Sequence, residues 1–143
     1  MKRAAWVLML FCATCARAEH WVTVASLTDL YGHPEVVWRY DQDQVRTNEG
    51  QTQIALLTSF VRDQFAEGKY RYLSKLERIQ VRCDEQTMTL SERMFYSHGR
   101  GRGQVVRTES FGTDGLIVQP KENTPSYEIL MSICGPEHAS PLT

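Results

Sequence analysis

Histidine and aspartate side chains are the groups from which a metal site or an acid–base pair would be built in this chain. Its four histidines are scattered along the sequence: His20, His33, His98 and His138. None has a His-x-x-x-His spacing, and no Cys-x-x-Cys pair occurs in residues 19–143, so the sequence predicts neither a metal site nor a cofactor. Asp41 and Asp43 could act as an acid–base pair or hold calcium, but the interpretation we favour is that they interrupt a strand.

The chain also lacks the usual signs of a nucleophile. No serine stands in a Gly-x-Ser-x-Gly motif. We expect Cys83 and Cys134 to be oxidised, and an oxidised cysteine does not attack a substrate. The sequence therefore predicts no catalytic residue and a non-enzymatic protein, since catalysis would require residues that only the fold brings together.

Three glycines alternate with two arginines in the segment Gly99-Arg100-Gly101-Arg102-Gly103. Glycine allows positive φ angles, and arginine binds anions through its paired N–H donors. Arg100 and Arg102 are therefore the candidate binding residues, and the alternative is a mobile, exposed hairpin loop. The segment is not a phosphate-binding P-loop, because the Lys-Ser/Thr ending and the following helix are missing.

The first 18 residues have the three parts of a secretory signal peptide. Lys2 and Arg3 form a basic start, residues 4–15 are uncharged and largely apolar, and Ala16-Arg17-Ala18 is a small-x-small cleavage site. The apolar run is too short for a stable membrane anchor. We predict that residues 1–18 are removed and that residues 19–143 form a single domain in the periplasm or at the cell surface.

Two cysteines within this segment raise the question of a lipid anchor. Phe11 precedes Cys12, and Cys12-Ala13-Thr14 precedes Cys15. A lipoprotein signal needs a small residue directly before its cysteine and short apolar residues before that. Neither cysteine fits, so a lipid anchor is not favoured.

The predicted mature chain is mildly acidic. It keeps 125 of the 143 residues, with 13 of the 16 basic residues and all 17 acidic ones, a net charge of about −4. That length suits one domain with one core. The charge does not favour nucleic acid or an anionic membrane as partner, and no later segment is apolar enough to cross a membrane.

An even pair of cysteines, Cys83 and Cys134, remains after cleavage. Exported proteins meet an oxidising environment, so a disulfide is the expected state and free thiols are the alternative. Closing a loop of about 50 residues would stabilise the fold by about 4 kcal/mol in the chain-entropy description. We expect the bridge to tie the last helix to the central hairpin.

The central stretch, from Tyr70 to Tyr96, predicts a long β-hairpin that turns at Asp84-Glu85. Apolar and polar residues alternate along it, as in an antiparallel sheet with one face buried and the other in water. On the return strand the residues expected on one face are Met88, Leu90, Met94 and Tyr96. The arginines expected on the solvated face of the hairpin are Arg78, Arg82 and Arg93.

Shorter strands are predicted on both sides of this hairpin, over residues 21–25, 35–40, 44–46, 51–61, 104–111 and 116–118, with a polar connection at 62–69. A final helix follows. Thr124 can cap its start, Pro125 suits the first helical position, and Gly135 can end it. Its apolar stripe has helical spacing and consists of Tyr127, Leu130, Met131 and Cys134.

The order of these features resembles the surface-adhesin protein E family of exported bacterial proteins. The residues that carry the resemblance are Trp21-Val22-Thr23-Val24, Tyr40-Asp41, Gln44-Val45-Arg46, Tyr72-Leu73-Ser74 with Arg78, Val81-Arg82-Cys83, Leu116-Ile117-Val118-Gln119-Pro120 and Ile133-Cys134. The resemblance covers most of residues 21–134, and the placement of the cysteines is its most specific part.

The resemblance implies an α+β fold, with an antiparallel sheet of about six strands, a C-terminal helix packed on it and a Cys83–Cys134 disulfide. It further implies binding of host extracellular-matrix or serum proteins at the bacterial surface, with a homodimer as one option. Two alternatives remain open from the residues themselves. One is a periplasmic structural or envelope protein without a host ligand, and the other is a small-molecule binder or enzyme with a pocket between sheet and helix.

Overall fold

The computed structural model describes residues 19–135, so the predicted signal peptide and residues 136–143 lie outside the described part of the chain. The elements are β1 (Trp21–Thr28), β2 (Pro34–Asp41), η1 (Gln42–Gln44), β3 (Arg46–Asn48), β4 (Gln51–Ala66), β5 (Tyr70–Arg82), β6 (Thr87–Tyr96), η2 (Gly99–Gly101), β7 (Val105–Ser110), β8 (Leu116–Val118) and α1 (Pro125–Cys134). The elements labelled η are single turns of 3-10 helix.

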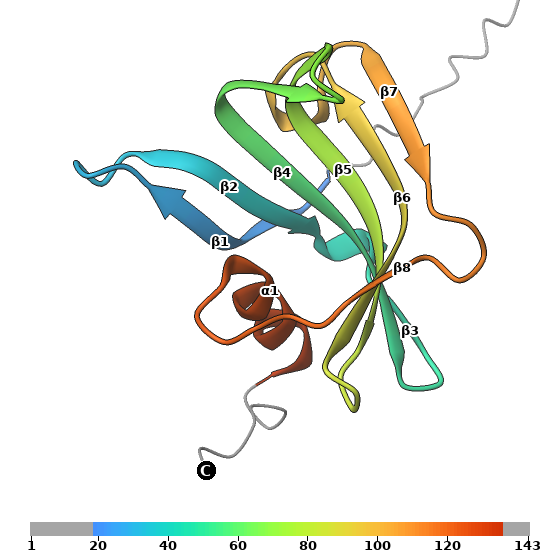
Figure 1. Cartoon of the computed structure of the whole chain (residues 1–143). Helices are drawn as coiled ribbons and strands as arrows, with labels where there is room; N and C mark the ends of the chain where they lie inside the picture. Colours follow the sequence, from blue (N-terminus) through green and yellow to red (C-terminus); the bar gives the residue numbers. More distant parts are fainter. Residues whose placement is uncertain (1–18, 136–143) are drawn as a thin grey trace, which may run out of the picture.

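The strands form one antiparallel sheet in the order β1-β2-β4-β5-β6-β7, with β3 paired to β4 and β8 paired to β6. Figure 1 shows the sheet strongly twisted, with the β1–β2 hairpin extending away from β4, β5 and β6, and with α1 beneath that hairpin. The predicted α+β fold with a main sheet of six strands is therefore confirmed. The remaining two strands, β3 and β8, are only three residues long.

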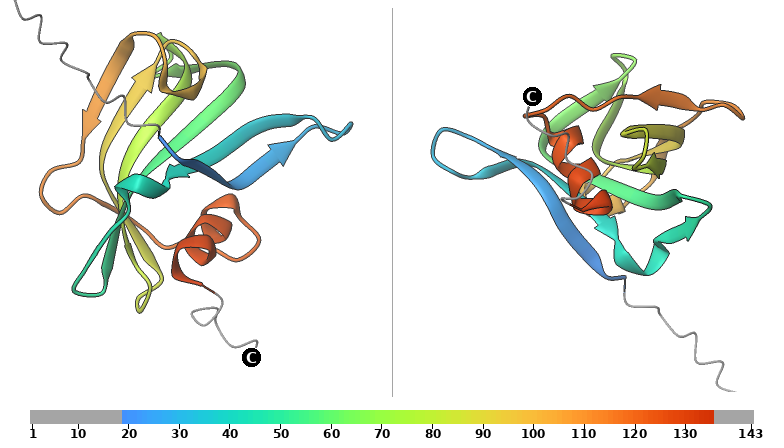
Figure 2. Two further views of the ribbon diagram at one scale, coloured as in Figure 1. Left: turned by 180° about the vertical axis from the view of Figure 1, so that it is seen from behind. Right: turned by 90° about the horizontal axis from the view of Figure 1, so that it is seen from below.

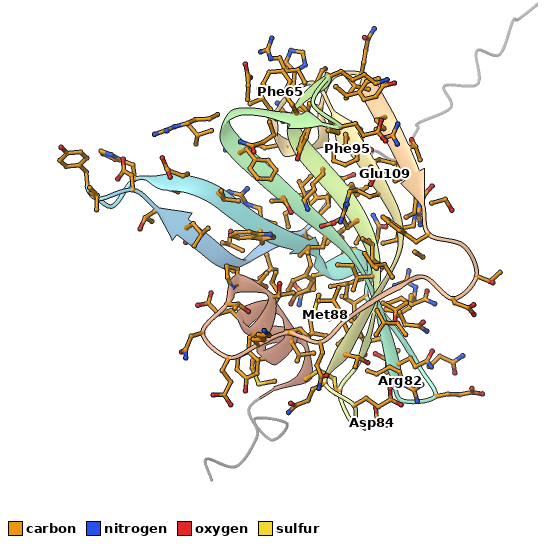
Figure 3. The ribbon with its side chains drawn as sticks, viewed as in Figure 1. Phe65, Arg82, Asp84, Met88, Phe95 and Glu109 are labelled. Atoms are coloured by element: carbon orange, nitrogen blue, oxygen red, sulfur yellow. A yellow bond between two sulfur atoms is a disulfide. The ribbon has the colours of Figure 1, made fainter. Side chains whose placement is uncertain are left out.

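The main core lies between α1 and one face of β4, β5 and β6, which we call the helix-side face. Seen from below in Figure 2, α1 lies between the β1–β2 hairpin and the other strands. The buried core residues are Ala25, Ile54, Leu56, Ile79, Val81, Met88, Leu90, Ile129, Leu130 and Cys134. Burial of one large aliphatic side chain contributes about 1.5–3 kcal/mol, so this layer holds helix and sheet together. Figure 3 places Met88 within it.

The helix begins and ends where the sequence predicts. The Thr124 hydroxyl accepts a hydrogen bond from the Tyr127 N–H at 3.3 Å, and Pro125 occupies the first turn. Gly135 has a φ of 81°, and its N–H donates to the Met131 carbonyl at 2.8 Å. Within the described part of the chain, no helix is long and apolar enough to cross a membrane.

The predicted disulfide is present between Cys83 and Cys134, whose Cα atoms lie 5.5 Å apart. Cys83 directly follows β5, and Cys134 is the last residue of α1. The bridge therefore ties the end of the helix to the turn between β5 and β6, as expected.

A β-bulge in β6 overturns the predicted facing of its second half. Arg78 pairs with Glu92 and Ile79 pairs with Leu90, so Ser91 is an extra residue in β6. Beyond Ser91 the alternation is reversed. We predicted that Met88, Leu90, Met94 and Tyr96 share one face of the sheet. This prediction is wrong, because Met94 and Tyr96 lie on the face opposite Met88 and Leu90.

Arg93 changes face for the same reason. It was expected to be solvated, but the bulge turns it to the helix-side face, where its side chain is 23% exposed and contacts two carboxylates. Phe95, two residues further on, is 4% exposed. The solvated interpretation holds for Arg78, whose side chain is 62% exposed.

The predicted polar connection at residues 62–69 is also wrong for most of its length. β4 continues to Ala66, and Ala66 pairs with Tyr70 in β5. Glu67 and Gly68 form the turn with φ angles of 49° and 69°. The sequence did not predict this extension of β4, because its apolar residues Val61 and Phe65 are exposed. The usual alternation of buried apolar and exposed polar residues is therefore missing there.

Candidate functional site

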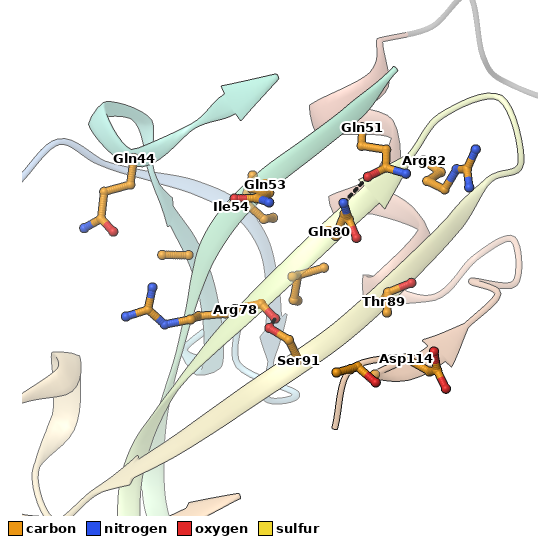
Figure 4. Close-up of a pocket in the computed structure, with 14 residues that line it drawn as sticks. Gln44, Gln51, Gln53, Ile54, Arg78, Gln80, Arg82, Thr89, Ser91 and Asp114 are labelled. Atoms are coloured by element: carbon orange, nitrogen blue, oxygen red, sulfur yellow. Dashed lines mark hydrogen bonds between the residues drawn. The ribbon is translucent and has the colours of Figure 1, made fainter. Parts of the chain in front are cut away.

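The face of β4, β5 and β6 opposite the helix, which we call the outer face, carries a polar groove with a volume of about 480 Å³. Four glutamine side chains line it: Gln44, Gln51, Gln53 and Gln80. Hydroxyl and charged groups complete the lining, from Arg78, Arg82, Thr89, Ser91, Thr113 and Asp114. We call this the glutamine groove, and Figure 4 shows its side chains along the three strands.

The groove exists because of a small residue and two flanking segments. Ala55 lies between the outward positions Gln53 and Leu57 of β4, and its short side chain leaves space above the sheet. Gln44 in η1 closes one side, and the turn at residues 113–115 closes the other.

Much of the hydrogen-bonding capacity in the groove is unused. Gln80 donates to the side chain of Gln51 (Figure 4), and Gln44 donates to Asp41 at 2.8 Å. Gln53 and Thr89 make no side-chain hydrogen bond with another described residue. The groove therefore offers both donors and acceptors to a ligand or to water.

A second feature of the outer face is the glycine–arginine loop, which folds back onto the sheet. The Ser74 hydroxyl donates to the His98 carbonyl at 2.5 Å and accepts from the Gly101 N–H at 2.9 Å. The Arg100 N–H donates to the Ser59 hydroxyl at 3.3 Å. The loop is thus held on β4 and β5 by three hydrogen bonds, in contrast to a free hairpin tip.

The loop uses its glycines at defined positions. Arg100 and Gly101 both have positive φ, 60° and 67°, which makes the tight turn. Gly103 has a φ of 81°, and a Cβ atom there would lie 2.2 Å from the side chains of Ser97 and His98. Only glycine fits at position 103 without moving them.

The loop forms one wall of a second hollow, with a volume of about 570 Å³. The residues around it are Glu19, Trp21, Arg39, Leu57, Arg100, Gly101 and Arg102. Arg39 pairs with Leu57 across β2 and β4, so both share the outer face. We call this the arginine hollow. The structure thus adds Arg39 to the two predicted residues.

The helix-side face beyond the end of α1 carries a network of ion pairs. Arg93 donates to Glu77 at 2.7 Å and to Glu109 at 3.2 Å, and Lys75 lies 3.2 Å from Glu77. The Glu77 side chain is 8% exposed. Figure 3 places Glu109 near Phe95, at the end of the sheet away from Met88. These charges satisfy one another, so the network stabilises this end of the sheet.

Aromatic rings pack beside this network. The rings of Tyr72 and Phe95 lie edge to face with centroids 4.7 Å apart, and Phe60 contacts Tyr72 in the same way at 5.7 Å. Burial raises the pKa of the Tyr72 hydroxyl above 10.0, and the negative charge of Glu77 acts in the same direction. Tyr72 therefore remains neutral at physiological pH.

The aspartate pair interrupts a strand, as we favoured. Asp41 is 2% exposed, and its carboxylate accepts from the Asp43 N–H at 3.0 Å, which begins η1. Asp43 instead lies 3.0 Å from His20. Among residues 19–135, no three His, Cys, Asp or Glu side chains form a group that could hold a metal ion.

Sequence reasoning missed Arg39 and Trp21 as parts of one hollow with the loop. A signal for Arg39 was present, since it alternates with Trp38 and Tyr40 and so lies on the face of β2 opposite those aromatic residues. What the sequence did not contain is the strand order that sets β2 beside β4 and the loop above them.

The fold and these hollows define an α+β domain, in which a disulfide-tied helix covers one face of an antiparallel sheet and the other face is open. The family model of surface-adhesin protein E matches residues 21–135. The chain belongs to this family.

Solved structures of Haemophilus influenzae protein E have the same fold. Crystal form II is 14% identical to this chain, with a TM-score of 0.54, and the match covers 79% of this chain and 95% of that one. The selenomethionine form is 15% identical, with a TM-score of 0.53, covering 83% and 98%. No curated protein sequence matches the chain.

Proposed function

We propose that this chain is an exported, non-enzymatic binding domain that engages a host extracellular-matrix or serum protein through its outer face. Membership of the surface-adhesin family supports this proposal. The observation that carries it is the distribution of filled and open space. Apolar side chains fill the layer between sheet and helix, whereas the glutamine groove and the arginine hollow lie on the outer face.

This distribution argues against a pocket between sheet and helix, where a small molecule would be enclosed. The outer face instead presents the two hollows at successive outward positions of β4, with Ala55 in one and Leu57 in the other. An open, polar surface of this kind is suited to a macromolecule, which supplies its own complementary shape.

The first test is the location of the protein. Protease added to intact cells should digest it, and an opened-envelope sample serves as the control for intrinsic sensitivity. Protection on intact cells, followed by digestion after opening, would place the protein in the periplasm and overturn contact with a host protein.

The second test compares two faces of the purified protein. Gln53 and Ser132 are both exposed, one on the outer face and one on α1. Binding to immobilised basement-membrane extract and serum proteins should weaken at least tenfold in Gln53→Tyr, because a bulky side chain then fills the groove, and should be unchanged in Ser132→Tyr. Equal effects of the two substitutions would contradict a role for the outer face.

A further inference from the structure

Most arginines of the described chain are neutralised by a carboxylate. Six of them lie within 4.0 Å of an aspartate or glutamate: Arg62, Arg71, Arg78, Arg82, Arg93 and Arg107. Arg46 donates to two main-chain carbonyls. Within residues 19–135 the side chains of Arg39, Arg100 and Arg102 have no ion pair and no hydrogen bond.

These three arginines line one hollow, although they come from β2 and from the loop after β6. Three guanidinium groups around one space repel one another, and such an arrangement is favourable chiefly when an anion is bound. Guanidinium groups match carboxylates in charge and in geometry, because each can donate two parallel hydrogen bonds.

One acidic side chain, Glu19, also lines the hollow. Its Oε2 atom accepts a hydrogen bond from the indole N–H of Trp21 at 2.7 Å, and it forms no ion pair with the arginines. The side chains of the lining therefore keep an excess of two positive charges.

The hollow is built in advance of binding. Ser59 and Ser74 fix the loop to the sheet, and Arg39 projects from a strand paired on both sides. A preformed site binds more tightly than a flexible one, because less conformational freedom is lost on binding.

We propose that the arginine hollow binds a short acidic segment of a partner protein and takes up one or two of its aspartate or glutamate carboxylates. This inference rests on the proposed function, since it names the partner chemistry at the same outer face. Two excess charges match one or two carboxylates. Glu19 and the net charge of the mature chain, about −4, both disfavour a dense polyanion such as a sulfated polysaccharide.

The probe is a fluorescein-labelled peptide with four consecutive aspartates between glycine–serine flanks, and its asparagine counterpart is the control ligand. Fluorescence anisotropy should show binding of the aspartate peptide alone, weakening as salt is raised. Arg100→Ala or Arg102→Ala should weaken binding about threefold, as for exposed ion pairs, and the half-buried Arg39→Ala about tenfold.

Two variants sharpen this test. Arg71→Ala removes an equal charge from an exposed position outside the hollow, where Arg71 pairs with Asp63, and should leave the affinity unchanged. Glu19→Ala should tighten binding about threefold, because it removes the opposing carboxylate. A gain in affinity is not expected from structural damage.

Three outcomes would overturn the inference. The first is peptide binding that does not change in Arg39→Ala, Arg100→Ala or Arg102→Ala, or that falls by the same factor in the control Arg71→Ala. The second is no binding of the peptide by the folded wild-type protein. The third is heparin binding that exceeds peptide binding and depends on the same arginines, which would assign the hollow to sulfated polysaccharide.

The same variants separate this inference from the proposed function. Matrix or serum protein could still bind after the arginine substitutions and fail to bind Gln53→Tyr. That result would support the proposed function and show that the arginine hollow takes no part in it. If the hollow binds the acidic peptide but the protein binds no host protein, the inference about the hollow would stand and the proposed host-binding function would be wrong.

Discussion

The hydroxyl of Ser74 donates a hydrogen bond to the main-chain carbonyl of His98, 24 residues later in the sequence, at 2.5 Å. The same oxygen accepts the Gly101 N–H. Ser74 has no exposed surface. One buried serine therefore fixes the loop that carries Arg100 and Arg102 to the outer face of β5.

Ser74→Ala should destabilise the protein by about 1–3 kcal/mol, because it leaves a carbonyl and an N–H group without their partner. It should also weaken binding of the acidic peptide, since the loop is no longer held in place. Urea unfolding and anisotropy measure the two effects. Ser110→Ala, at an exposed position of β7, is the control and should change the stability by less than about 0.5 kcal/mol. Equal effects of both substitutions would contradict the role of Ser74.

Arg100 has a φ of 60°, a conformation that costs a residue other than glycine about 1 kcal/mol. Arg100→Gly relieves this cost but increases the freedom of the unfolded chain, so the free energy of unfolding should change by less than about 1 kcal/mol. Affinity for the acidic peptide should nevertheless fall about threefold, as in Arg100→Ala. A large loss of stability, or an unchanged affinity, would show that this arginine has a structural role instead.

The disulfide closes a loop with a sequence separation of 51 residues. Replacing both cysteines, Cys83→Ser with Cys134→Ser, should lower the free energy of unfolding by about 4 kcal/mol. Urea unfolding of the double variant should match that of the reduced wild-type protein, which serves as the control. If reduction left the midpoint unchanged, the bridge would not be what holds α1 on the sheet.

Glu77 is the buried centre of the ion network that the bulge at Ser91 creates. Glu77→Gln removes the carboxylate between Lys75 and Arg93 and should cost roughly 2 kcal/mol, since Arg93 keeps Glu109 as a partner. Glu92→Gln is the matched control.

The control removes an exposed pair with Arg78 and should cost less than about 1 kcal/mol. Thermal or urea unfolding compares the two variants. A larger loss in Glu92→Gln would contradict the inward position of Arg93.

Asp29 should make the β1–β2 hairpin sensitive to acid. Hydrogen bonds from the main-chain N–H groups of His33 and Tyr31, at 2.9 and 2.8 Å, lower its pKa below 3.8, and the His33 bond is the larger cause. The carboxylate is therefore charged in the fold, and its contribution is fully present above pH 3.8. It is lost as the pH falls through the lowered pKa.

Amide exchange of His33 measured by NMR should accelerate below pH 3.8, after correction for the intrinsic rate. In Asp29→Asn the N–H groups still meet a side-chain oxygen but the titration is removed, so this acid-dependent step should disappear. An identical pH profile in both proteins would contradict the role of Asp29.

The sequence alone determined much of the fold. Alternating residues predicted the long hairpin, and local capping chemistry at Thr124 and Pro125 predicted the start of α1. The cysteine count, taken with the expected signal peptide, predicted the Cys83–Cys134 bridge. These inferences succeeded because each depends on residues close together in the sequence, or on there being only two cysteines in residues 19–143.

The tertiary structure decided the rest. Alternation predicts which face of the sheet a side chain lies on only along a regular strand. One extra residue, Ser91, therefore placed Arg93 and Met94 on the faces opposite to those predicted. The arginine hollow required β2 to lie beside β4, with the loop after β6 held on them by Ser74. Strand order and a long-range hydrogen bond depend on how the whole chain packs, and no local pattern in the sequence encodes either.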